Sequence, residues 1–178
     1  MLREVKKTAN FLKEQTNESP TTGIILGTGL GGLVKDIKIN YTISYADIPN
    51  FPVSTVEGHS GRLIFGKLGS ISVVAMQGRF HFYEGYPIQK VTFPVRVMKY
   101  LGIRNLIVSN ASGGVNPNFE IGDLMILNDH INLIPNPLIG HNYNELGPRF
   151  PDMSEPYCLD MIKKAEKIAT ANNLKVQK

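Results

Sequence analysis

Residues 23–32, G-I-I-L-G-T-G-L-G-G, place a short apolar run directly before a glycine-rich turn. An apolar run of this length, bounded by turn residues, predicts a buried strand. The pattern occurs a second time, where the apolar run Leu106–Val108 leads into S-N-A-S-G-G at residues 109–114. In open α/β sheets, ligands bind at the carboxyl ends of the strands. We therefore expect both strands to be buried and their two glycine-rich turns to meet at one rim of a sheet.

Helical patterns alternate with these strands. Apolar residues recur with a helical period in residues 5–13, 88–101 and 157–171. The predicted apolar faces consist of Val5, Ala9 and Leu12 in the first helix, and of Val91, Val95 and Met98 in the second. Strands are also predicted at residues 41–45 and 124–127, and a hairpin is predicted for residues 62–76. Because strands alternate with helices, the predicted class is α/β.

Two further stretches bear on the organisation of the chain. Residues 128–151 are rich in Asn, Pro and Gly and lack periodicity, and a loop this long in a compact domain is usually functional or disordered. After the last helix, L-K-V-Q-K at residues 174–178 has the pattern of a strand that is just beginning. We interpret residues 1–178 as a single domain truncated on its C-terminal side, with an incomplete sheet.

Composition excludes several classes of protein. The chain has 178 residues, of which 42% are hydrophobic and 19% charged, as in globular domains. The net charge of +4 is too diffuse for a nucleic-acid footprint, and no apolar run is long enough to span a membrane. Cys158 is the single cysteine, which fits a reducing compartment, and we expect a cytoplasmic protein. Cys158 lies in an apolar helical stretch, so we expect it in the core rather than as a nucleophile.

Residues 77–86, Q-G-R-F-H-F-Y-E-G-Y, carry the strongest functional pattern. If the stretch is extended, Arg79, His81 and Tyr83 share one face, whereas Phe80 and Phe82 point to the other. A guanidinium, an imidazole and a phenol in a row suit an oxyanion with hydroxyls nearby. The alternative is a half-buried strand whose polar face meets water. The flanking glycines at positions 78 and 85 favour a site, because they permit a sharp turn or a close approach to a ligand.

The glycine-rich turns are open to several interpretations. Residues 27–32 fit G-x-G-x-x-G, but no long helix follows and Asp47 comes too early for a dinucleotide site. Their backbone N–H groups, with the Thr28 hydroxyl, suit an anion, and the alternative is a turn without a ligand. Small residues at 109–114 let a flat ligand approach the backbone, although Ser109 or Ser112 could equally cap a helix.

The other polar candidates are less specific. His59 lies in E-G-H-S-G and gains a role only if it reaches the same anion as Arg79 and His81. Glu57, Glu84 and Asp129 suit a base, a hydroxyl acceptor or a structural partner, and spacing does not decide among these. The four histidines lack H-x-x-x-H spacing and no second cysteine is present, so we expect no metal site.

Five motifs, in this order and at these distances, resemble one family: G-T-G-L-G-G, E-G-H-S-G-R, Q-G-R-F-H-F-Y-E-G-Y, S-N-A-S-G-G-V-N and R-F-P-D-M-S. The chain resembles the purine nucleoside phosphorylases of the homotrimeric type from about residue 23 to its end. The related methylthioadenosine phosphorylases share the fold but differ in the stretch that matches residues 79–86. The resemblance implies a three-layer α/β/α fold with a mixed central sheet. It also implies phosphorolysis of purine ribonucleosides or deoxyribonucleosides to the free base and pentose 1-phosphate, without metal or organic cofactor.

Site residues follow from the resemblance position by position. The implied phosphate ligands are Thr28, His59, Arg79, Phe80, His81 and the backbone N–H of Ala111, of which Arg79, His81 and His59 count as catalytic. The implied nucleoside contacts are Tyr83 to the ribose, Ala111, Ser112 and Gly113 along the base, and Phe150 reaching the site of a neighbouring subunit.

The chain also departs from the family pattern. Thr28 stands where many relatives have serine, and Ser112 where many have alanine. Family members continue past Lys178 with the residues that grip the purine, so base specificity is not decided within this sequence. The alternative function is therefore a non-catalytic chain that retains a phosphate-binding rim.

Overall fold

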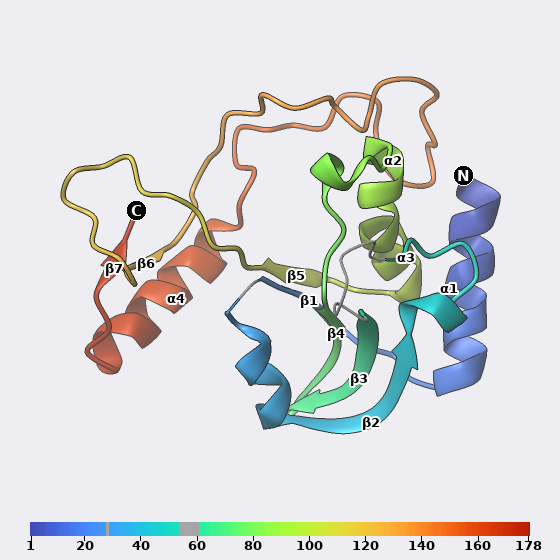
Figure 1. Ribbon diagram of the computed structural model, residues 1–178, viewed down its shortest axis with the longest axis horizontal. Coiled ribbons are helices and arrows are strands. Elements are labelled where there is room, and N and C mark those ends of the chain that lie inside the picture. Colours follow the sequence, from blue (N-terminus) through green and yellow to red (C-terminus); the bar gives the residue numbers. More distant parts are fainter. Residues whose placement is uncertain (28, 54–60) are drawn as a thin grey trace. The chain divides into compact units, whose positions relative to one another are not determined.

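The computed structural model describes residues 1–27, 29–53 and 61–178 (Figure 1). The chain divides into two compact units, Met1–Ala111 and Ser112–Lys178. The first unit contains a five-stranded sheet and the second a two-stranded sheet.

The sheet of the first unit is mixed. Its strands are β1 (Thr22–Leu26), β2 (Ile37–Ser44), β3 (Arg62–Leu68), β4 (Ile71–Gln77) and β5 (Asn105–Val108). Their order is β2-β3-β4-β1-β5, with β1 parallel to both β4 and β5. β3 is antiparallel to β2 and β4, and the predicted hairpin turns through Gly69, which has φ +59°. The predicted α/β class with a mixed sheet is confirmed.

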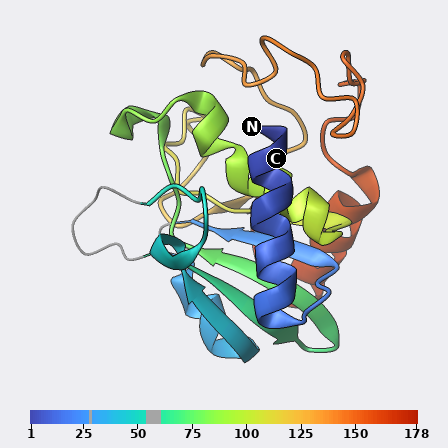
Figure 2. The ribbon, with the colours of Figure 1, turned by 90° about the vertical axis from the view of Figure 1, so that its right-hand side faces the viewer.

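Helices cover one face of this sheet. They are α1 (Leu2–Thr16), the short α2 (Ile88–Val91) and α3 (Phe93–Leu101), and α1 packs against α3 (Figure 2). The predicted face of α1 is confirmed, because Val5, Ala9 and Leu12 are all buried.

The predicted continuous helix over residues 88–101 is wrong. It is interrupted at Thr92, because Pro94 lacks a backbone N–H and occupies the first turn of a new helix. The interruption changes which residues face the core. Val95 is exposed, and the residues buried in α3 are Phe93, Pro94, Val97, Met98 and Leu101.

Both faces of the hairpin strands are buried. Leu63, Phe65, Val74 and Met76 lie in one hydrophobic core with residues of α1 and α3. Ile64, Val73 and Ala75 lie in a second core with Val34 of the 3-10 helix η1 (Gly31–Asp36). Alternate side chains of a strand point to opposite faces, so these two sets fill the two sides of the sheet.

The prediction that Leu106–Val108 is buried is wrong. Leu106, Ile107 and Val108 are 38–56% exposed. Within the described part of the first unit, β5 pairs only with β1 and therefore forms an edge of the sheet, where side chains have fewer neighbours. The strand itself is present as predicted.

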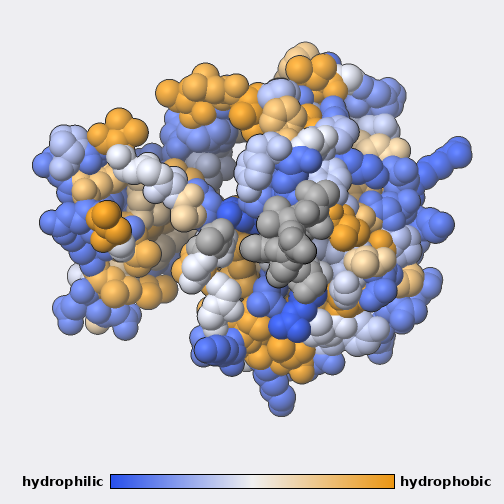
Figure 3. Space-filling view, viewed as in Figure 1, coloured by the Kyte–Doolittle hydropathy of each residue, from blue (hydrophilic) through white to orange (hydrophobic). Residues whose placement is uncertain are grey.

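The second unit contains α4 (Leu159–Ala171) and the parallel strands β6 (Leu124–Met125) and β7 (Val176–Gln177). β7 lies in the stretch predicted to begin a strand, whereas β6 is shorter than predicted. Cys158 is exposed at the start of α4, so its predicted burial is wrong. The segment between β6 and α4 exposes many apolar side chains, among them Ile131, Leu133, Ile139 and Phe150. Hydrophobic residues are visible at several places on the surface of the molecule (Figure 3).

Acid is expected to loosen the pairing of β6 with β7. The pKa of the Asp123 carboxyl lies below its usual range, because the backbone N–H of Glu120 and the side chain of Gln177 donate hydrogen bonds to it. Stabilisation from a lowered folded-state pKa is complete above the ordinary carboxyl value of about 3.9 and is lost as pH falls through the lowered value. The measurement is hydrogen-exchange protection of the Ile126 amide, which donates to the Gln177 carbonyl. Protection should fall below about pH 4.

The matched control for this effect is Asp123→Asn. This variant should show reduced Ile126 protection already at neutral pH and no further loss in the acid range. Protection that falls equally with pH in both proteins would contradict the role given to this carboxylate.

Candidate anion-binding rim

The carboxyl ends of β1 and β5 are joined by a set of hydrogen bonds. The Gly27 backbone N–H donates to Ser109 Oγ over 3.0 Å, and the Ser109 N–H donates to the Ile25 carbonyl over 3.0 Å. Gly27 has no room for a side chain, since a Cβ there would lie 2.4 Å from the Ser109 carbonyl oxygen. The predicted meeting of the two glycine-rich turns is confirmed for these residues.

Arg79 brings a cation to this rim. It follows β4, which lies on the other side of β1 from β5. Its Nη1 donates to the Ser109 carbonyl over 3.2 Å, so the guanidinium reaches across the end of β1. This bond uses one of five N–H donors in a planar fork that suits oxyanions. Arg79 and the glycine-rich turn are thus parts of the same rim.

His81 is held by Glu84 in the turn that follows. The backbone N–H of His81 donates to Glu84 Oε1 over 2.8 Å, and the same oxygen lies 2.8 Å from His81 Nδ1. The Glu84 side chain is only 3% exposed. An ionised carboxylate can only accept, so Nδ1 carries the proton in this contact and Nε2 is the nitrogen left for a ligand.

Tyr83 stacks on this imidazole. The rings of His81 and Tyr83 are nearly parallel, with centroids 4.8 Å apart. The Tyr83 side chain is otherwise open, at 78% exposure. A phenol placed beside a half-buried imidazole offers one further hydrogen-bonding group to a hydroxylated ligand.

Residues 77–86 do not meet the condition of being extended throughout. β4 ends at Gln77, and residues Phe82–Glu84 form a 3-10 turn, η3. The turn arises because Gly78 and Gly85 take positive φ and the Glu84 carboxylate caps the His81 backbone. Phe80 is buried as predicted, whereas Phe82 is 44% exposed and does not lie on the core. The Phe80 side chain lies in an aromatic cluster, so its backbone is the part that can face a ligand.

The other predicted site residues are placed as follows. Thr28, Glu57 and His59 lie outside the described residues. Ala111 ends the first unit, two positions after Ser109, and its carbonyl accepts a bond from the Asn110 side chain. Ser112, Gly113, Asp129 and Phe150 belong to the second unit, where Phe150 is 87% exposed.

Three residues of the rim were not recognised for these roles from the sequence. Glu84 was left undecided, although its position three residues after His81 has the spacing of a reciprocal cap. Ser109 is placed by the sequence in the second glycine-rich turn and as a candidate helix cap, but not as the partner of Arg79. Tyr45, whose hydroxyl donates to the Gly78 carbonyl over 2.8 Å, gave no local signal because its partner lies far along the chain.

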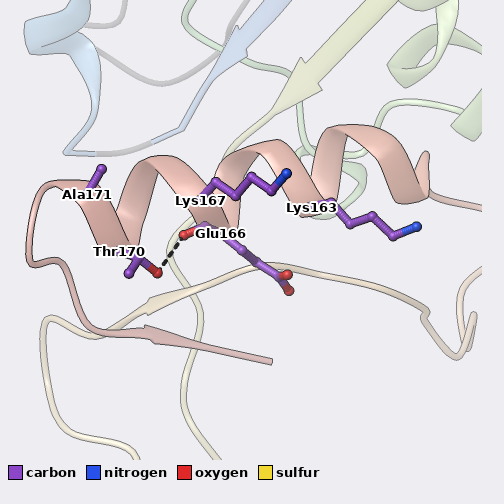
Figure 4. Close-up of a pocket in the computed structure, with 5 residues that line it drawn as sticks. All are labelled: Lys163, Glu166, Lys167, Thr170 and Ala171. Carbon is purple, nitrogen blue, oxygen red and sulfur yellow. Dashed lines mark hydrogen bonds between the residues drawn. The ribbon is translucent and has the colours of Figure 1, made fainter.

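An open pocket on α4, in the second unit, carries no comparable arrangement. It is lined by Lys163, Glu166, Lys167, Thr170 and Ala171, all from the same helix (Figure 4). The Thr170 hydroxyl bonds back to the Glu166 carbonyl within the helix, and the Glu166 carboxylate pairs with Lys178. In the described parts of the chain no group of three or more His, Cys, Asp or Glu side chains could hold a metal ion, and no helix is long and apolar enough to cross a membrane.

The fold agrees with comparisons to known proteins. Residues 21–178 match the Phosphorylase superfamily, and the chain belongs to this family. Within it, the chain is 56% identical to purine nucleoside phosphorylase 1 of Bacillus subtilis, over all of this chain and 66% of that protein. It is 53% identical to purine nucleoside phosphorylase of Bos taurus, over 91% of this chain and 57% of that protein. The predicted resemblance to purine nucleoside phosphorylases is confirmed.

Solved structures show the same likeness. The crystal structure of Schistosoma mansoni purine nucleoside phosphorylase in complex with adenosine superposes with a TM-score of 0.93 at 46% identity, over 98% of this chain and 63% of that one. A purine nucleoside phosphorylase in complex with ribose-1-phosphate gives a TM-score of 0.92 at 46% identity, over 99% of this chain and 67% of that one. The chain spans 66% or less of the length of the curated relatives named above.

Proposed function

We propose that this chain takes part in the phosphorolysis of purine ribonucleosides and deoxyribonucleosides, a reaction of purine salvage. The observation that carries the proposal is the Arg79 guanidinium, held by the Ser109 carbonyl at the glycine-rich rim. The cation lies at the carboxyl ends of three adjacent strands, where α/β sheets bind ligands. Relatives at up to 57% identity named as purine nucleoside phosphorylases support this reaction class.

Phosphorolysis requires a phosphate anion held in position beside the sugar. As the bond between C1′ and the purine nitrogen breaks, its electron pair leaves with the base and positive charge develops on the sugar. A phosphate oxygen on the opposite face then forms the new bond to C1′, giving pentose 1-phosphate. Arg79 donates to oxygens of that phosphate, and His81 Nε2 accepts from its P–OH group. The negative charge held there stabilises the developing cation.

The remaining assignments belong to the same proposal. Thr28, His59 and the Ala111 N–H add phosphate contacts, and Tyr83 meets the ribose beside His81. Ser112, Gly113 and Phe150 contribute on the nucleoside side. The reaction proposed here uses inorganic phosphate as co-substrate and needs no cofactor.

We further propose a cytoplasmic homotrimer. The exposed apolar side chains between β6 and α4, Phe150 among them, suit burial against another subunit. Sedimentation velocity measures the assembly: a species of three chains is expected, and a monomer at working concentration would contradict it.

Phosphate-dependent release of hypoxanthine from inosine tests the reaction. Product is expected with inosine and phosphate together, little without phosphate, and little with Arg79→Ala. Release that does not depend on phosphate would contradict the proposal. Phosphate binding measured by calorimetry without turnover would support the alternative of a non-catalytic chain with a phosphate-binding rim. Preference for methylthioadenosine over inosine would support the related branch of the family.

Glu84→Gln is expected to weaken phosphate binding roughly three- to tenfold. The amide side chain loses the charge that holds the proton on His81 Nδ1. The tautomer whose unprotonated Nε2 accepts a hydrogen bond from the P–OH group of inorganic phosphate is then less favoured. Calorimetry gives the affinity, and imidazole ¹⁵N chemical shifts give the tautomer. Glu18→Gln, a matched change on a carboxylate that accepts a hydrogen bond from Asn40, should alter neither quantity. If Glu84→Gln changes affinity without changing the tautomer, the role assigned to Glu84 is wrong.

A further inference from the structure

Tyr45 occupies a buried position beside the rim. It begins the 3-10 helix η2 (Tyr45–Asp47) directly after β2, and only 1% of its surface is exposed. Its backbone N–H donates to the Gly61 carbonyl over 3.0 Å. Its ring lies so close to Gly61 that a Cβ there would be 2.1 Å from a ring carbon. The tyrosine ring therefore has one well-defined place, which only glycine at position 61 permits.

The Tyr45 hydroxyl is hydrogen-bonded to Gly78, the residue before Arg79. It donates to the Gly78 carbonyl over 2.8 Å, and burial raises the pKa of the phenol, so the hydroxyl remains a donor. Gly78 has φ +99°, a left-handed conformation that favours glycine. The Gly78 carbonyl and the Arg79 N–H belong to one planar peptide group. Fixing this carbonyl therefore fixes the direction in which the chain enters Arg79.

The Tyr45 ring packs against Phe80, the residue after Arg79. The rings of Tyr45 and Phe80 lie 5.1 Å apart in a tilted arrangement, and Phe51 contacts both. Both neighbours of Arg79 are thus held by the same side chain, Gly78 through the hydroxyl and Phe80 through the ring. The Arg79 guanidinium is held separately, by the Ser109 carbonyl.

We propose that Tyr45 is a positioning residue for Arg79, and that its hydroxyl sets anion affinity through the Gly78–Arg79 peptide group. The anion itself, inorganic phosphate, rests on the proposed function. The hydroxyl is the informative part, because phenylalanine keeps the ring contacts and removes only the bond to Gly78.

Calorimetric titration with inorganic phosphate tests the proposal on the full chain. Tyr45→Phe is expected to weaken binding roughly five- to tenfold. The control Tyr41→Phe removes a phenol hydroxyl from a partly buried ring of β2 and should stay within about twofold of the unchanged chain. In the Arg79→Ala background, Tyr45→Phe should cause no further loss. An equal loss in both backgrounds, or no loss in either, would overturn the proposal.

A second measurement needs no ligand. The backbone amide and side-chain Nε–H resonances of Arg79 should shift in Tyr45→Phe and stay in place in Tyr41→Phe. Unchanged Arg79 resonances in Tyr45→Phe would overturn the positioning role, whatever the affinity. If the resonances shift but the unchanged chain binds no phosphate, the positioning role stands and the proposed function fails.

Discussion

Replacing Arg79 by alanine is expected to weaken phosphate binding on the order of a hundredfold, and replacing it by lysine roughly tenfold. Alanine removes the charge and every charge-assisted hydrogen bond of the guanidinium. Lysine restores the charge but not the planar fork, which reaches the Ser109 carbonyl and has the geometry to bind an oxyanion through two hydrogen bonds. The measurement is calorimetric titration at constant ionic strength, because salt screens the charge contribution.

Arg104→Ala is the matched control. Arg104 is exposed and lies just before β5, at the end of the sheet opposite the rim. Its loss changes net charge by the same amount and should leave phosphate affinity within about twofold of the unchanged chain. If Arg79→Lys binds phosphate as tightly as arginine, the geometry of the guanidinium does not matter and the bidentate role is wrong. If Arg79→Ala and Arg104→Ala lower phosphate affinity equally, Arg79 contributes only through the net charge of the protein and not through a specific site.

Gly27→Ala is expected to lower the free energy of unfolding by about 2–4 kcal/mol. The added Cβ would lie 2.4 Å from the Ser109 carbonyl oxygen and 2.8 Å from Asn110 Cα. These are backbone atoms, which cannot rotate away as a side chain does, so β1 and the chain after β5 must separate. Urea unfolding measures the change, and phosphate binding should weaken with it because the Ser109 carbonyl also holds Arg79.

Gly32→Ala provides the comparison for this substitution. No atom lies within 4 Å of a Cβ at Gly32, and its backbone does not have positive φ. The free energy of unfolding of Gly32→Ala is expected to be unchanged or up to about 1 kcal/mol higher, because alanine restricts the conformations of the unfolded chain. Equal unfolding midpoints for the two variants would show that the contact between Gly27 and Ser109 is looser than described.

Local patterns predicted most of the first unit. The face of α1 and the hairpin from β3 to β4 follow from short-range periodicity, which the structure retains. The interruption before α3 was missed because the helical period of residues 88–101 was weighed without the consequence of Pro94. The exposure of β5 could not be predicted, because an apolar run does not show how many strands will pair with it.

The candidate site was predicted in part for similar reasons. Glycine-rich turns after strands indicated the rim, and Arg79 lies there. Residues 77–86 are not extended throughout, because the Glu84 carboxylate stabilises a turn. The alternation of polar and apolar residues in this stretch does not reveal that turn. The role of Tyr45 could not be predicted from local sequence patterns, because its hydrogen bond to Gly78 joins positions 33 residues apart.

The bond from Arg79 to Ser109 also couples ligand affinity to the integrity of the sheet. It links the chain after β4 to the chain after β5, across the end of β1. Fraying of β5 would therefore remove the Ser109 carbonyl that holds Arg79 as it opens the edge of the sheet. By mass action, an anion bound to Arg79 should hold that outermost strand in place, so that ligand binding would also stabilise the edge of the sheet.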